Sequence, residues 1–154
     1  MNVIYQEDEK SCVACSLAWM ANYLHNGKQF DWKTLFLACG NPKDGLEPSI
    51  AIKKAKEMGW IRLGFRIPTS LARIFLHFGL PVLIGVPMNR LFWSGTSWEH
   101  PVPWVDPNDE DHMVVLNGQD EFGNLQVVGW GCPDKQEVRL LDKNYPIFKS
   151  YLCL

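Results

Sequence analysis

The order of the hydrophobic patterns along this chain constrains its fold more than any other feature. Over the first part of the chain, apolar side chains recur at helical spacing and predict helices at 12–24, 32–39 and 48–58. The later part contains apolar runs of strand length at 60–67, 81–87, 112–117, 124–128 and 136–141, with one short helical pattern at about 69–78. A helical half followed by antiparallel strands predicts an α+β fold, in which a helix of the first half packs on a C-terminal antiparallel sheet.

Length and charge limit the classes of protein that this chain can belong to. A chain of 154 residues can bury a sizeable core, so we expect a single domain over 1–154. A formal net charge of −2 gives no electrostatic reason to expect a nucleic-acid partner. No apolar run is long enough to span a membrane, and the acidic N-terminal residues lack the apolar core of a signal peptide. We therefore expect a cytoplasmic protein, or one delivered as an effector or encoded by a virus. The sequence leaves its oligomeric state open.

The cysteines favour reduced thiols over a disulfide framework. Their number is odd, and they stand at Cys12, Cys15, Cys39, Cys132 and Cys153. The C-x-x-C formed by the first two could belong to a redox site or to half of a zinc site. A zinc site needs two further ligands at similar spacing, and a thioredoxin-type site needs a strand that leads directly into the motif. We therefore expect no metal and no cofactor, and keep redox chemistry as a weaker alternative.

Cys12 stands where the first helix is expected to begin. A thiol at a helix N-terminus faces backbone N–H groups and the positive end of the helix dipole, which favour the thiolate. His112 opens a strongly apolar strand and is a candidate base for that thiol. Each residue alone could be structural, because cysteines are often buried and a histidine can head a strand without any chemical role. Together they indicate a nucleophile and its base.

Two stretches of the sequence resemble the motifs of a known family. The first has a glutamine, a cysteine six residues later, and a helix with small and aromatic residues, namely Gln6, Cys12, Ala14, Met20 and Tyr23, with Asp8 and Glu9 between the first two. The second begins at His112 and continues Met-Val-Val-Leu. They resemble the cysteine and histidine motifs of the bacteriocin-processing peptidases, which are papain-like domains attached to peptide-exporting ABC transporters.

This resemblance implies a papain-like fold and a cysteine peptidase that acts on a peptide or protein. Cys12 would be the nucleophile and His112 its base, with Gln6 and the Cys12 N–H as the oxyanion hole. The same pair would also serve a deamidase or a transglutaminase-type transferase. Members of the family orient the histidine with an Asn or Asp about sixteen residues after it, but here Val128 stands at that position. This departure favours a second alternative, an inactive papain-like module that binds a partner protein.

A long segment rich in Trp and Pro, 88–111, separates the expected central strand from His112. Irregular segments of this length in a compact domain are usually functional or disordered. Trp93 and Trp98, with Trp130 after the hairpin, are candidates to line a substrate groove. The alternative is that these aromatic side chains only pin the segment to the core.

Overall fold

A computed structural model describes residues 11–26, 28–86, 112–128, 139–141, 143–144 and 146–154. Three helices come first, namely α1 (Cys12–Leu24), α2 (Trp32–Ala38) and α3 (Pro48–Glu57). The remaining elements are β1 (Gly64–Ile67), the 3-10 turn η1 (Thr69–Leu71), α4 (Ala72–His77), β2 (Val82–Val86), β3 (His112–Gln119), β4 (Leu125–Val128), β5 (Arg139–Leu141) and β6 (Lys149–Cys153). This order of elements confirms the predicted α+β class.

The six strands form one antiparallel sheet in the order β1-β6-β2-β3-β4-β5. All five residues of β2 are buried, and this strand lies between β6 and β3, as its continuous apolar run predicts. The sequence pattern did not predict β6, which enters the sheet between β1 and β2. This strand from the end of the described residues therefore joins β1 to the rest of the sheet.

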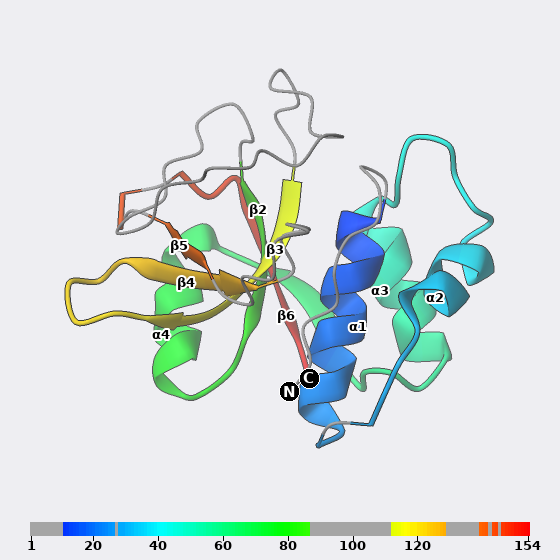
Figure 1. Ribbon diagram of the computed structural model, residues 1–154, viewed down its shortest axis with the longest axis horizontal. Helices are drawn as coiled ribbons and strands as arrows, with labels where there is room; N and C mark the ends of the chain where they lie inside the picture. Colours follow the sequence, from blue (N-terminus) through cyan, green and yellow to red (C-terminus); the bar gives the residue numbers. More distant parts are fainter. Residues whose placement is uncertain (1–10, 27, 87–111, 129–138, 142, 145) are drawn as a thin grey trace.

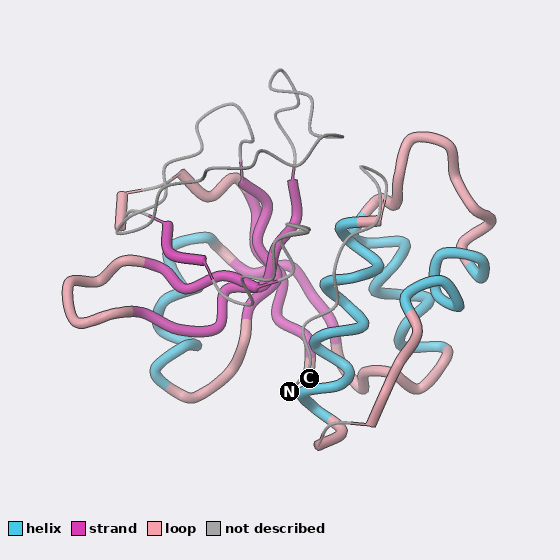
Figure 2. Tube along the Cα trace, viewed as in Figure 1, coloured by secondary structure: helices cyan, strands magenta, loops and turns pink. Residues whose placement is uncertain are grey.

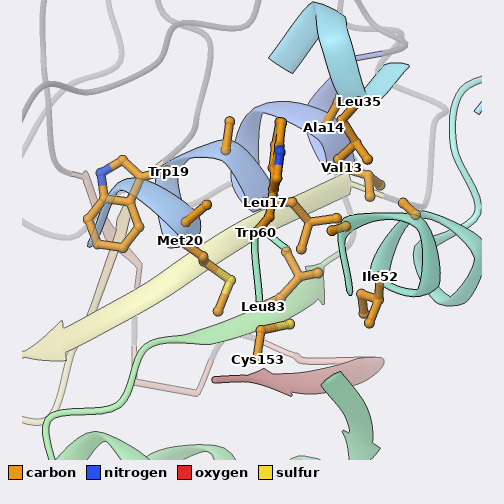
Figure 3. Packing of buried hydrophobic residues seen from close by; sticks show 14 of the residues in the cluster. Val13, Ala14, Leu17, Trp19, Met20, Leu35, Ile52, Trp60, Leu83 and Cys153 are labelled. Carbon is orange, nitrogen blue, oxygen red and sulfur yellow. The ribbon is translucent and has the colours of Figure 1, made fainter. Parts of the chain in front are cut away.

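Helices cover both faces of the sheet (Figure 1). The helices α1, α2 and α3 gather on one side, and α4 packs on the other (Figure 2). On the α1 face, Leu17 and Met20 of the helix meet Leu83 of β2 and Cys153 of β6 (Figure 3). Side chains that alternate with these along β2 and β3, among them Ile84 and Val114, form the second cluster with α4. Successive side chains along β2 and β3 thus point to opposite faces of the sheet and enter two separate apolar layers.

Local sequence explains where the helices begin and end. The Asp31 carboxylate accepts from Lys33 N at 3.0 Å at the start of α2, and Glu47 accepts from Ile50 N at 3.0 Å at the start of α3. The chain leaves α1 through Asn26, whose φ of 55° lies in the left-handed region that asparagine tolerates. The predicted helix at 69–78 is shorter, because its first turn is the 3-10 turn η1.

The predicted strand at 60–67 is wrong over its first half. Trp60 N bonds back to Ala55 O, and its side chain and that of Ile61 are buried beside the helices. The N–H groups of Arg62 and Leu63 both donate to Leu154 O, and no ladder begins until Gly64. A Cβ at Gly64 would lie 2.3 Å from Ile52 Cγ2, so the close approach of α3 requires glycine here. Packing against α3, which periodicity does not reveal, overrides the strand pattern.

Candidate active site

Cys12 is the first residue of α1 and is half-buried. The helix has 13 residues, and every residue from Val13 to Asn22 is buried, so the helix is enclosed on all sides over this stretch. The Ser11 carbonyl accepts from Cys15 N at 2.8 Å and closes the first turn. Unlike Asp31 of α2, Ser11 makes no side-chain capping bond. The thiol therefore lies at the positive end of a well-anchored helix dipole, as the sequence predicted.

His112 is the first residue of β3 and pairs with Val86, the last residue of β2. Only 5% of its surface is exposed. The pleat gives it the parity of Val114, which packs on the α4 face, while the next residue, Met113, packs against α1. This alternation places the imidazole at the start of β3 on the α4 face of the sheet, opposite the face that α1 covers.

The start of α1 and the start of β3 are joined by one buried hydrogen bond. Ser16 Oγ donates to Met113 O at 3.3 Å. Ser16 lies one turn after Cys12, and Met113 follows His112, so the bond ties together the ends of the two elements that carry these residues. Figure 1 shows both elements starting at the same end of the molecule. The sequence did not single out Ser16, although a polar residue within an apolar helix was a signal that it has a specific partner.

Burial controls the protonation of His112. It lowers the pKa of the imidazole to about 3, because the charged form loses its hydration. At pH 7 the ring is therefore neutral in this conformation, and the same burial makes it a weaker base than an exposed histidine. The dipole of α1 favours the thiolate form of Cys12, which lies at the helix N-terminus.

The position expected for an Asn or Asp is part of the hydrophobic core. Val128 is 2% exposed, pairs with Val115 and packs in the cluster on the α1 face. The polar candidates in the hairpin are remote, because Asp120 lies eight residues beyond His112, or about 25 Å along a strand. Asp120 is also engaged in the turn, where it accepts from Asn124 Nδ2 at 2.9 Å. Where the resemblance places the third residue of a catalytic triad, this protein has the buried aliphatic side chain of Val128.

Several predicted site residues, namely Gln6, Trp93, Trp98 and Trp130, lie outside the described residues. Three other cysteines lie within the described residues. Cys15 is buried. Burial raises the pKa of the Cys39 thiol, and it raises the pKa of the Cys153 thiol to about 12. Within the described ranges no three His, Cys, Asp or Glu side chains are gathered where they could hold a metal ion. In the same part of the chain, no helix has the length and apolar character needed to cross a membrane.

Comparison with known proteins agrees with the fold. The sequence matches no protein-family model, and no curated protein matches it. Among solved structures, the chain is similar to the peptidase domain of Streptococcus ComA, a bi-functional ABC transporter involved in a quorum-sensing pathway. The TM-score is 0.69 at 15% identity, and the match covers 98% of this chain and 96% of that domain. The predicted α+β fold is confirmed, and the chain has the same fold as that peptidase domain.

Proposed function

We propose that this protein is a cysteine peptidase in which Cys12 is the nucleophile and His112 its base. The observation that carries the proposal is the junction of α1 with β3, where the residue one turn after Cys12 contacts the residue next to His112. The similarity to a peptidase domain supports the same assignment. Gln6 is proposed as the side-chain donor of the oxyanion hole, by its spacing from Cys12.

The proposed chemistry is acyl transfer through a thioester. Cys12 Sγ attacks the carbonyl carbon of a peptide bond, and the thiol proton passes to the neutral imidazole of His112. The tetrahedral intermediate collapses, the C–N bond breaks, and His112 returns the proton to the leaving amine. Water then adds to the thioester, which releases the acid and restores the thiol.

The test compares the cysteines of one molecule. Iodoacetamide is added to the full chain at pH 7, and alkylation of each thiol is followed by mass spectrometry. We expect Cys12 to react first, Cys39 slowly and the buried Cys153 last, because burial raises the pKa of the latter two. The substitution His112→Ala should slow alkylation of Cys12 by roughly tenfold or more. A positioned base contributes about 10²-fold or more to a catalysed step, so tenfold is a cautious threshold for alkylation. Equal rates at Cys12 with and without His112 would contradict the proposal.

The reaction catalysed is tested separately with a mixture of cellular peptides. Wild type should create new peptide termini that Cys12→Ser does not create. Conversion of glutamine to glutamate without new termini would identify a deamidase, and joined peptides a transferase. These three outcomes share the same Cys12 and His112 chemistry but differ in the acceptor or in the amide that reacts.

A second candidate is a papain-like module without catalytic activity that binds a partner protein. Val128 favours it, because the residue that would orient the histidine is a buried aliphatic side chain. The deep burial of His112 favours it too, since the low pKa opposes an imidazolium. This candidate predicts that Cys12 is alkylated no faster than Cys39 and that His112→Ala leaves the rate unchanged.

A further inference from the structure

We propose that Ser16 is a positioning residue for the Cys12 and His112 pair, acting through its hydrogen bond to the Met113 carbonyl. The inference rests on the proposed function and adds to it the contact that holds the two reacting elements in register. Ser16 would touch neither substrate nor the reacting atoms. Its effect would be transmitted through one turn of α1 and one residue of β3.

Ser16 lies on the side of α1 that carries Cys12. Residues four apart on a helix share one face, and the bond from Ser16 to Met113 O shows that this face meets β3. The Ser16 hydroxyl is fully buried, and its acceptor belongs to the residue that follows His112. The bond therefore fixes how far along β3 the helix sits, within one turn of the nucleophile.

Apolar packing also holds α1 against the sheet, for example through Leu17 in the cluster on the α1 face. Apolar burial is strong but non-directional, so it tolerates small shifts of a helix along its axis. A hydrogen bond is directional and weakens steeply when its angle falls below about 120°. The hydroxyl thus supplies a precise register that hydrophobic packing alone does not supply.

The chain contains a matched control. Ser150 is also fully buried, and its hydroxyl donates to Ile67 O at 2.9 Å, between β6 and β1. Both serines satisfy a backbone carbonyl from far along the sequence, so truncation should destabilise the protein to a similar extent. Only Ser16 joins the elements that carry Cys12 and His112.

The experiment measures alkylation of Cys12 against pH across the range in which thiols and imidazoles titrate, on the full chain. Wild type is compared with His112→Ala, Ser16→Ala, Ser150→Ala and the double variant Ser16→Ala/His112→Ala. Displacements of about 1 Å can cost 10²-fold in rate, so we expect Ser16→Ala to slow Cys12 by roughly tenfold. Its pH profile should move toward that of His112→Ala, while Ser150→Ala stays within about twofold of wild type.

Two further readouts separate positioning from general destabilisation. Ser16→Thr keeps the hydroxyl and should restore the wild-type profile; if its extra methyl lowers the urea midpoint, Ser16→Cys, which keeps the size and a weak donor, takes its place. In the His112→Ala background, Ser16→Ala should have no additional effect, because the residue through which it acts is gone. Equal changes in Ser16→Ala and Ser150→Ala would overturn the inference while leaving the proposed function intact. A wild type without His112-dependent reactivity would overturn both.

Discussion

The two ends of β3 are held in different ways. At its C-terminal end, the turn that leads into β4 is exposed and makes its hydrogen bonds among near neighbours. The Asp120 carboxylate accepts from the backbone N–H groups of Phe122 at 2.9 Å and Asn124 at 2.8 Å. At its N-terminal end, His112 and Met113 are buried, and Met113 O accepts from Ser16, 97 residues away. The exposed end is specified locally, whereas the buried end depends on the assembled fold.

Hydrogen bonds from α4 and from the segment after β5 reinforce the exposed turn. Arg73 of α4 donates from Nη1 to Gly123 O at 3.2 Å and from Nη2 to Lys143 O. Asn124 Oδ1 accepts from Lys143 N at 3.1 Å. The side chains of Asp120, Arg73 and Asn124 therefore all hold this end, and loss of one leaves the others in place. At the other end, His112 and Met113 are buried, so substitutions there should have larger effects.

The largest expected effect comes from His112 in acid. Its folded pKa of about 3 lies below the unfolded value of about 6.5, so in this window the unfolded chain binds a proton that the native state does not. The free energy of unfolding should therefore fall as pH drops from 6.5 toward 3, by about 1.4 kcal/mol per pH unit and on the order of 5 kcal/mol in all.

Urea unfolding of wild type and His112→Phe at several pH values tests this expectation. The phenylalanine keeps a buried ring but cannot titrate, so the slope between pH 6.5 and 5 should flatten. A slope that persists in His112→Phe would assign the acid sensitivity to other groups. A wild type that gains stability from His112 on acidification would show a stabilised imidazolium instead.

Val128→Asn should cost about 2 kcal/mol of stability, because it buries an amide in an apolar cluster. Val127→Asn is the matched control, since Val127 is equally buried but belongs to the cluster on the α4 face. Because His112 has the parity of the α4 face, we expect Val128→Asn to leave the alkylation rate of Cys12 unchanged, whereas Val127→Asn shows whether a buried amide on the histidine's face alters that rate. Faster alkylation of Cys12 in Val128→Asn alone would contradict this expectation and show that position 128 reaches the histidine.

Arg73→Ala should lower stability by about 1–2 kcal/mol, because two carbonyl groups lose a charged donor. Alkylation of Cys12 should not change, since the turn lies at the other end of β3. Arg66→Ala, at an exposed position on β1, is the control for loss of a positive charge. A change in Cys12 reactivity in Arg73→Ala alone would mean that the two ends of the strand are coupled.

The smallest effect is expected for Asp120→Asn. Desolvation raises the pKa of this carboxyl, but hydrogen bonds from the Asn124 side chain and from the backbone of the turn outweigh it and hold the pKa below its usual value. The stabilising contribution is therefore present at neutral pH and is lost as pH falls through the folded pKa. The difference in thermal midpoint between wild type and variant should shrink in acid, with the exposed Glu121→Gln as control. A constant difference would assign the effect to shape and not to charge.

The same contrast explains what the sequence could predict. The hairpin was predicted with its turn, because polar residues such as Asp120 and Asn124 act on their immediate neighbours. The pairing of Cys12 with His112 came from a resemblance between motifs and not from any local pattern. Ser16 was missed because its partner is remote, and the burial of Val128 on the α1 face depends on how the sheet twists against the helix. Gln6 and the tryptophans stay predictions.

Strand β6 was missed for a related reason. Its five residues pair with β1 and β2, whose sequences lie far upstream, and its side chains are buried on both faces. A fully buried strand lacks the polar alternation that marks an exposed one. A short segment of this kind forms a strand only when two neighbouring strands are in place to pair with it.

The place of β6 between β1 and β2 has a consequence for how the molecule is made on the ribosome. Until residues 149–153 have been synthesised, β1 has no neighbour in the sheet and the edge of β2 is unpaired. Contacts so distant in sequence form slowly, and an open apolar edge is a template for wrong pairing. We therefore expect β1 to stay unpaired with the rest of the sheet until β6 has been synthesised. Overexpression in cells with abundant chaperones should yield more native protein than expression without them.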